Sequence, residues 1–445
     1  MKHILIIGAG RSTPYLIKYL LDQSSTHTWR VTVGDVIIDN AIQKLNNHPN
    51  GNAIEFDVHN DEQMDKEIGK VDIVVSMLPA RFHIHVVKAC VRLKKNLITA
   101  SYVSDEIKEF DEDAKKAGII LLNEIGVDPG LDHMSAMQII DKIRARGGKP
   151  RSFETFTGGL VAPESDNNPW HYKFTWNPRN VVLAGQGVVK FIQEGRYKYI
   201  PYHNIFKRTE KLSVLDYGEF EGYANRDSLQ YREIYDLHDI PTMFRGTLRR
   251  PGFCRAWDLL VQLGATDDSY TIEDSKNMTY REFINSFLLY RPDDSIELKL
   301  AYYLGIDIES PEMEKLKWLG VFNDTRIGLK NATPAQILQH LLKDKWELGP
   351  KDKDMIVMLH KIKYKSIDTY RFITSSLVVI GEKEPYTAMA KTVGLPLGIA
   401  AKLILNGNVK ARGIQLPIIK EIYEPALKEL QEFGINFIEG EIILT

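Results

Sequence analysis

The sequence predicts an α/β protein built on a doubly wound parallel sheet, joined to a mixed α+β domain and a helical insert. The first observation is a series of short apolar runs, each followed by a helical pattern, over about the first 130 residues. The second is a change after Gly147-Gly148 to alternating apolar and polar residues, which is typical of half-buried strands. The third is helical periodicity from about residue 268 to residue 346.

Bulk composition excludes several functional classes. The chain has 445 residues, of which 44% are hydrophobic, enough for two or three domains with their own cores. A net charge of -2 gives no indication of binding to nucleic acid or to an anionic membrane. The two cysteines, Cys90 and Cys254, exclude a disulfide framework and favour a reducing compartment. We find no apolar run long enough to span a bilayer and expect no signal peptide, so we predict a cytoplasmic protein.

The N-terminal segment predicts the phosphate-binding corner of a dinucleotide fold. His3–Ile7 has the pattern of a strand, Gly8-Ala9-Gly10 forms a turn, and a helix with Pro14 in its first turn follows. Gly8 permits the turn, and Gly10 lets the backbone approach a pyrophosphate at the helix N-terminus. An ordinary βα turn is the alternative, because Thr13 stands where the third motif glycine is expected. The predicted cofactor contacts here are Gly8, Gly10, Arg11, Ser12 and Thr13.

Further strands follow in order, and their carboxyl ends carry the rest of the predicted cofactor site. Strands are expected at Trp29–Val33, Asn52–Val58, Val71–Met77, Lys95–Ala100 and Gly118–Asn123. Helices lie between them, for example around Asp105–Ala117. Ligands of such sheets bind outside the carboxyl ends of the strands. The further contacts predicted there are Asp35, Asp57, Val58, Met77, Leu78 and Pro79. Alternating strands and helices thus predict a Rossmann-type domain over residues 1–131.

Asp35 predicts the choice of cofactor. It lies about 20 residues beyond the glycine turn, where an acidic residue accepts hydrogen bonds from the adenosine ribose of NAD. The 2′-phosphate of NADP would face the same carboxylate. The nearest basic residue, Lys44, is expected a full turn or more into the next helix. We therefore predict that NAD is preferred over NADP, with turn capping by Asp35 as the alternative.

The rest of the chain predicts two further domains. Strand-like stretches at Ser152–Thr157, Leu212–Tyr223 and Met355–Lys365 indicate an α+β domain at 132–267 and 347–390. A helical domain at 268–346 holds four predicted helices, at Tyr280–Leu289, Ser295–Leu304, Ser310–Leu319 and Thr333–Leu342. The helix of small residues at Thr387–Ala401 suits close packing on a sheet, and we expect residues 391–445 to complete the first domain.

Few residues in the second half carry recognisable chemistry. Two loops hold Arg226 and Arg245, and guanidinium groups on separate loops suit a substrate with several carboxylates, unless they are solvated. The segment Glu124–His133 places Asp128 and His133 near the ligand edge of the sheet, with a capping role as the alternative. No Ser-His-Asp, Walker A or His-Glu-x-x-His pattern supports a hydrolase or a kinase. His83 and His85 have no further ligands nearby, so we predict no metal site.

Eight segments carry a resemblance to a known family. They are SYVS (101–104), EIGVDPGLDHM (124–134), GGLVAPESDNNP (158–169), YKFTW (172–176), YANRDS (223–228), RGTLR (245–249), KWLG (317–320) and AMAKTVGLP (388–396). In order and in content they resemble saccharopine dehydrogenases of the glutamate-forming type, also called saccharopine reductases. The resemblance spans nearly the whole chain and implies a Rossmann domain, a mixed substrate domain and a helical domain.

The resemblance also implies a reaction in lysine metabolism. Saccharopine is oxidised at its secondary amine by NAD(P), and the imine is hydrolysed to L-glutamate and 2-aminoadipate 6-semialdehyde. The implied substrate site, which must receive three carboxylates, consists of Ser101, Tyr102, Asp128, Trp176, Arg226, Arg245 and Thr247. Asp128, Tyr102 and His133 are unranked candidates for proton transfer. Family members that use NADP commonly have a basic residue where this chain has Asp35. A homodimer is left open.

Two departures from the family pattern leave the exact substrate open. Phe156-Thr157 stands where the family usually has Tyr-Cys, and Val161 stands where it usually has proline. One alternative is a carboxyspermidine-type dehydrogenase, which would need acidic residues for an amine tail where this chain offers Arg226 and Arg245. The other is a non-catalytic NAD-binding regulatory protein, which would bind the cofactor without turnover.

Overall fold

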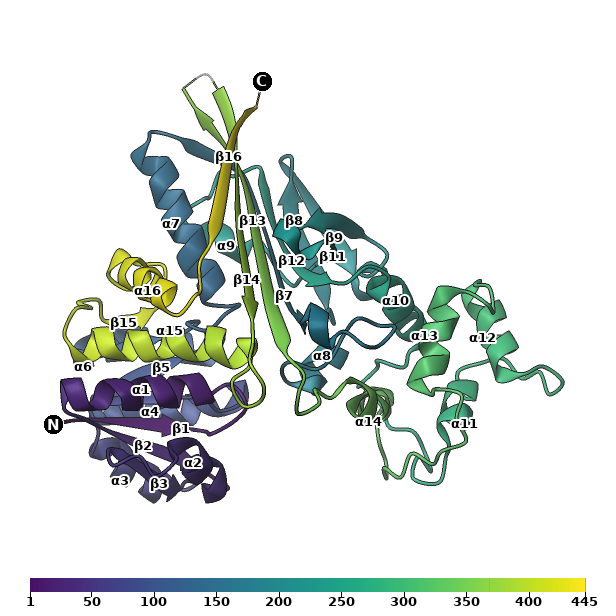
Figure 1. Ribbon diagram of the computed structural model, residues 1–445, viewed down its shortest axis with the longest axis horizontal. Helices are drawn as coiled ribbons and strands as arrows, with labels where there is room; N and C mark the ends of the chain where they lie inside the picture. Colours follow the sequence, from purple (N-terminus) through teal and green to yellow (C-terminus); the bar gives the residue numbers. More distant parts are fainter. Residues whose placement is uncertain (368, 445) are drawn as a thin grey trace.

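The computed structural model describes residues 1–367 and 369–444 and contains two sheets. Figure 1 shows three parts: a parallel sheet with its helices at the lower left, a long twisted sheet in the middle and a lobe of helices on the right. The α/β fold class predicted from the sequence, with its parallel sheet and its mixed second sheet, is confirmed.

The first sheet has seven strands in the order β15-β6-β5-β4-β1-β2-β3, and every pair is parallel. Its strands are β1 (Lys2–Ile7), β2 (Trp29–Asp35), β3 (Gly51–Glu55), β4 (Ile73–Ser76), β5 (Asn96–Thr99), β6 (Ile120–Leu122) and β15 (Gly413–Gln415). All six strands predicted in the first part of the chain are present with shifted ends. β3 ends early because the Asp57 carbonyl accepts from the Asn60 N–H, so Asp57 and Val58 lie in a turn.

The helices of the first sheet follow its strands along the chain. They are α1 (Pro14–His27), α2 (Ile38–Leu45), α3 (Asp61–Gly69), α4 (His83–Leu93), α5 (Asp105–Lys108) and α6 (Asp111–Ala117). The segment predicted as one helix over Asp105–Ala117 is two, because the backbone leaves the helical path at Phe110, the residue that precedes α6.

The second sheet is mixed and has a long central strand. Its strands are β7 (Lys149–Val161), β8 (Val188–Gln193), β9 (Arg196–Pro201), β10 (Thr209–Ser213), β11 (Glu219–Ala224), β12 (Thr242–Arg249), β13 (Asp354–Ser366), β14 (Thr369–Ile380) and β16 (Ile438–Leu444). β7 pairs parallel with β12 and antiparallel with β13. The predicted strand at Leu212–Tyr223 is instead a hairpin of β10 and β11, joined through a turn that ends at Gly218.

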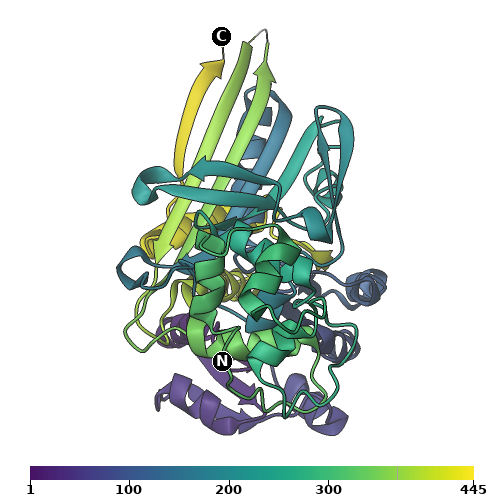
Figure 2. The ribbon, with the colours of Figure 1, turned by 90° about the vertical axis from the view of Figure 1, so that its right-hand side faces the viewer.

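The C-terminal tail is shared between the two sheets. α15 (Ala388–Leu405) packs on α1 and β15 joins the first sheet, but β16 pairs with β14 of the second. We had expected all of residues 391–445 to complete the first domain. β16 differs because β14 has a free edge that the alternating residues of the tail can extend. Figure 2 shows these three long strands, β13, β14 and β16, running upward together. The exact domain boundaries stay predictions.

The helix α15 differs from the expectation that the chain has no apolar run long enough to span a bilayer. Its 18 residues are long and apolar enough to cross a membrane by composition, although 78% of them are buried inside the fold. Gly394 and Gly398 bring it against Leu16 and Tyr19 of α1, which is the close packing that small residues suggested. We therefore interpret α15 as a core helix.

The helical lobe contains α11 (Tyr280–Asn285), α12 (Ile296–Leu304), α13 (Pro311–Leu319) and α14 (Pro334–Trp346). Ser295, Ser310 and Thr333 cap the last three by accepting from backbone N–H groups. The remaining helices are α7 (Leu131–Ala145), α8 (Pro178–Val182), α9 (Gln230–Ile234), α10 (Phe253–Leu263) and α16 (Lys420–Glu432). One apolar core joins the lobe to the second sheet, where the rings of Trp170 and Trp346 lie 5.3 Å apart.

Candidate active site

The glycine turn has the geometry of a phosphate-binding corner. Gly8 has φ +98°, and a Cβ there would lie 2.9 Å from the Met77 carbonyl oxygen, so only glycine fits. A Cβ on Gly10 would meet nothing within 4 Å, which leaves open space for a ligand. Thr13 is buried, and its hydroxyl donates to the Gly10 carbonyl at 2.8 Å. Thr13 thus holds the turn in the place of the missing third glycine, while the N-terminus of α1 faces outward.

A cavity of about 670 Å³ lies between this turn and the second half of the chain. It is lined by Gly10, Arg11, Ser12, Thr13, Met77, Pro79, Phe174, Trp176, Asn177, Pro178, Gln339, Lys343 and Glu347. The structure therefore brings Trp176 to the predicted cofactor residues of the turn and of the end of β4. Asp57 is exposed and accepts from the His59 N–H at 2.9 Å, whereas Val58 is buried in the apolar core. Neither of these two lines the cavity, and Leu78 does not line it either.

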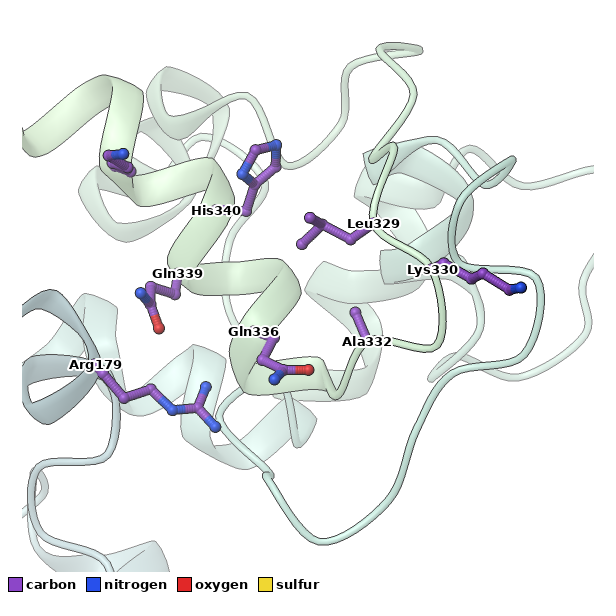
Figure 3. Close-up of a pocket in the computed structure, with 8 residues that line it drawn as sticks. Arg179, Leu329, Lys330, Ala332, Gln336, Gln339 and His340 are labelled. Carbon is purple, nitrogen blue, oxygen red and sulfur yellow. The ribbon is translucent and has the colours of Figure 1, made fainter. Parts of the chain in front are cut away.

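The helical lobe supplies the far wall of this cavity, which sequence reasoning missed. Gln339 and Lys343 lie on α14, and Glu347 follows it and pairs with Arg11 across the cavity at 3.2 Å. A second cavity of about 540 Å³ adjoins it and shares Gln339 and Lys343. Figure 3 shows Gln339 and Arg179 there, on facing elements. A lysine near the end of an amphipathic helix gives no sequence signal of a ligand site.

Asp35 caps the turn, as our alternative stated. Its carboxylate accepts from the Ala9 N–H at 2.7 Å and the Ile37 N–H at 2.9 Å, and from the Asn40 amide at 3.2 Å. Lys44 lies in the last turn of α2 as expected, but its ammonium reaches back and donates to the Ala9 carbonyl at 2.6 Å. The expectation that no positive charge stands near this corner is therefore corrected. Burial lowers the pKa of Lys44, and Asp35 opposes that effect.

A buried ion-pair cluster occupies the predicted substrate site. Arg245 of β12 is 2% exposed, and its Nη2 pairs with Asp128 and, at 3.2 Å, with Asp132. The guanidinium carbon lies 4.1 Å from the centre of the Tyr231 ring, and Nη2 lies 3.5 Å from the Tyr102 hydroxyl. Burial raises the pKa of Asp128, and Arg245 opposes the rise. Arg245 Nη1 is buried and has no hydrogen-bond partner in the described part of the chain.

The other predicted arginine is exposed. Arg226 has φ +50°, and its guanidinium carbon lies 5.3 Å from the centre of the Tyr102 ring. Within residues 1–367 and 369–444 it pairs with no carboxylate, in contrast to Arg245. Thr247 lies two residues beyond Arg245 on β12, and alternation along the strand puts both on one face.

Arg249 is a second buried arginine of β12. It follows on the same face of β12 and is buried among the rings of Tyr172, Phe253 and Tyr223, with no carboxylate partner in the described chain.

The three candidates for proton transfer differ in access. His133 is fully buried, with Nε2 3.0 Å from Glu124 Oε2 and Nδ1 2.9 Å from the Tyr235 hydroxyl. Because both ring nitrogens are occupied, its position does not support the predicted role. Burial raises the pKa of Tyr102, which disfavours its ionised form. Asp128 is half-buried at the ligand edge and is the best placed of the three.

The residues that depart from the family pattern have different surroundings. Thr157 donates a hydrogen bond that lowers the pKa of Asp128 and so belongs to the site. Phe156 is buried against Gly222 and Gly246 in the core of the second sheet. Val161 pairs with Asp354 near the start of β13.

Comparisons with known proteins agree over the whole length. The family model described as saccharopine dehydrogenase NADP binding domain matches residues 4–122, and saccharopine dehydrogenase C-terminal domain matches residues 126–435. A saccharopine dehydrogenase (NADP(+), L-glutamate-forming) from Pyricularia oryzae is 33% identical, covering 98% of each chain. The mitochondrial alpha-aminoadipic semialdehyde synthase of Bos taurus is 34% identical over 98% of this chain, which spans 47% of that protein.

Solved structures agree with the sequence comparisons. Apo saccharopine dehydrogenase (L-Glu forming) from Saccharomyces cerevisiae superposes with a TM-score of 0.90 at 31% identity, covering 99% of this chain and 100% of that one. A homospermidine synthase from Legionella pneumophila shares the fold, with a TM-score of 0.54 at 10% identity over 99% of this chain and 91% of that one.

Proposed function

Because this chain belongs to the saccharopine dehydrogenase family, we propose that it interconverts saccharopine with L-glutamate and 2-aminoadipate 6-semialdehyde, using a nicotinamide dinucleotide. The observation that carries the proposal is the presence, in a chain with a glycine-turn cavity, of two arginines with hydrogen-bond donors that no carboxylate of the described chain uses. Arg226 is exposed without an acidic partner in the described chain, and Arg245 keeps Nη1 free there. Saccharopine has three carboxylates that can pair with these two arginines.

The residues of the site have separate roles in the proposed reaction. The bound dinucleotide supplies the hydride acceptor for oxidation of the secondary amine. The glycine turn and the N-terminus of α1 hold its pyrophosphate, and Trp176 on the opposite wall helps to exclude water. Asp128, whose pKa is raised by burial, exchanges a proton with the secondary amine or with the water that attacks the imine. Arg226 and Arg245 fix the substrate carboxylates around that point.

We expect saccharopine and NAD to give NADH and glutamate at alkaline pH, where the secondary amine is unprotonated. Absorbance at the nicotinamide band follows the reaction, and NADP is run in parallel. A panel of amino acids and carboxylated polyamines serves as the control. Turnover with a carboxylated polyamine alone would overturn the proposal in favour of a carboxyspermidine-type enzyme. Cofactor binding with no turnover of any substrate would favour a regulatory protein.

The site itself disfavours a polyamine substrate. An amine tail needs free carboxylates, but Asp128 and Asp132 are already paired with Arg245. A homodimer and a cytoplasmic location stay predictions.

Replacing Arg226 by alanine should lower kcat/KM for saccharopine roughly tenfold to a hundredfold, because a charge-assisted hydrogen bond contributes about 1.5–3 kcal/mol. The affinity for the cofactor and the melting temperature should stay at wild-type values, since the side chain is exposed. Steady-state kinetics and a thermal melt of the same preparation measure both. Arg208→Ala, just before β10, is a matched exposed control. Wild-type kinetics of Arg226→Ala would remove this residue from the site.

We further propose that NAD is preferred over NADP. The curated fungal relatives are named for NADP(+), so the preference would set this chain apart from them. The support is Asp35, whose Oδ2 accepts a single hydrogen bond, from Ala9, and keeps capacity for a ribose hydroxyl. Lys44 is the opposing feature, because its ammonium lies at the same corner.

A further inference from the structure

A buried histidine joins two strand ends at the ligand edge of the first sheet. His83 is the first residue of α4 and is 1% exposed. Its Nδ1 lies 2.8 Å from Ser76 Oγ at the end of β4, and its Nε2 lies 2.7 Å from Ser101 Oγ just beyond β5. The Thr99 hydroxyl is a second, longer neighbour of Nε2 at 3.2 Å. His83 was set aside in the sequence because it lacked partners for a metal.

The direction of the hydrogen bonds follows from burial. Burial lowers the pKa of His83 to about 4, so the ring is neutral at working pH and has one N–H and one lone pair. Ser76 is fully buried, and in the described chain its hydroxyl has only His83 Nδ1 as a partner. A buried hydroxyl proton without an acceptor is costly, and of the two buried hydroxyls beside the ring Ser76 lies closer to its nitrogen than Thr99, at 2.8 Å against 3.2 Å, so we assign Ser76 as the donor to Nδ1. The proton on Nε2 is then donated to Ser101 Oγ.

With this assignment the Ser101 hydroxyl keeps its own proton unused. Its oxygen accepts from His83, and its backbone N–H donates to Thr99 Oγ1 at 3.3 Å, which fixes the residue on both sides. Ser101 is half-buried beside Tyr102, whose ring contacts Arg226. A hydroxyl in this position can donate to an anion, and the substrate brings three carboxylates to a site with few unpaired donors.

We propose that His83 is a positioning residue that turns the Ser101 hydroxyl so that it donates to a carboxylate of the bound amino acid. The inference deepens the proposed function and rests on it. His83 acts through Ser101 and touches neither substrate nor cofactor. Its removal should therefore weaken substrate binding without altering the proton transfers of the reaction.

A double-mutant cycle of His83→Leu and Ser101→Ala tests the proposal. Each single variant should raise KM for saccharopine about tenfold and change kcat less. The double variant should be no worse than either single one, which corresponds to a coupling of about 1.4 kcal/mol. His83→Gln, which places an amide near the position of Nε2, should recover part of the loss. The pH profile of kcat should keep its shape in every variant, because His83 does not titrate in the working range.

Matched controls separate positioning from damage to the fold. His85→Leu, two residues along α4, should have wild-type kinetics, since the ring of His85 packs beside His59 rather than Ser101. Should His83→Leu fail to give a cooperative melt, Ser76→Ala replaces it in the cycle, because it removes the donor that sets the ring. No turnover of saccharopine by the wild type overturns this inference together with the proposed function. Wild-type turnover with additive losses in the cycle overturns this inference alone.

Discussion

Arg245→Ala should lower kcat/KM by more than about a hundredfold and should also destabilise the protein. The structure makes this residue more than a carboxylate receptor, because its Nη2 pairs with both Asp128 and Asp132 in a buried cluster. Its removal leaves two buried carboxylates without their cation, and breaking a buried pair in this way costs about 3–5 kcal/mol. Activity and the thermal midpoint should therefore fall together, whereas Arg226→Ala should lower activity alone.

The pH dependence of this destabilisation has a definite sign. The pKa of Asp128 is raised in the folded state, so the folded protein keeps the proton to a higher pH than the unfolded chain does. Protonation of Asp128 stabilises the folded state. This contribution is fully present below the pKa of Asp128 in the unfolded chain and is lost as the pH rises through its pKa in the folded protein. Without Arg245 the pKa of Asp128 should rise further, so the deficit of the variant should be larger at neutral pH than near about pH 5.

Thermal melts of wild type and Arg245→Ala across this pH range measure the effect. Arg245→Lys is the matched control, because it keeps the charge but loses the planar fork, and it should recover stability better than activity. A melting temperature of Arg245→Ala equal to that of the wild type at neutral pH would contradict the prediction. It would mean that Asp128 and Asp132 do not depend on Arg245 for charge compensation.

Local sequence patterns predicted much of the fold. The six strands predicted in the first part of the chain are present, although their ends are shifted, and Ser310 and Thr333, the first residues of two predicted helices, cap α13 and α14. β16 could not be placed in this way, because its pairing with β14 depends on an edge that exists only in the folded second sheet. Strand pairing at long range leaves no trace in local periodicity.

The site was harder to predict than the fold, because its geometry depends on the direction of each side chain and on the groups that it contacts. Lys44 is in the helix where it was expected, yet its long side chain returns to the glycine turn. His133 stands next to ligand-edge residues in sequence but points into the core between Glu124 and Tyr235. Lys343 comes from a lobe that is far from the glycine turn in sequence and lines the same cavity. Residue type and spacing do not contain these directions.

The wild-type protein should use NAD at least a hundredfold better than NADP, as judged by kcat/KM. In NADP the 2′-phosphate would face the Asp35 carboxylate, and one ribose hydroxyl would lose its acceptor. Repulsion and the lost hydrogen bond act in the same direction, each on the order of 1–3 kcal/mol. Each 1.4 kcal/mol is about tenfold in an equilibrium constant, so the middle of the combined range, about 4 kcal/mol, exceeds a hundredfold.

Asp35→Ser should abolish most of this preference, and Lys44 makes the expectation sharper. Its ammonium lies at the same corner and is opposed by Asp35, so removing the carboxylate leaves a positive charge available to the 2′-phosphate. NADP use should therefore rise in Asp35→Ser and fall again in Asp35→Ser/Lys44→Met. Asp35→Asn removes the charge but keeps one carbonyl oxygen, which can accept from either the Ala9 or the Ile37 N–H, so it retains part of the turn capping that Asp35→Ser loses. Kinetics with both cofactors decide it: equal use by the wild type, or unchanged discrimination in Asp35→Ser, would show that Asp35 only caps the turn.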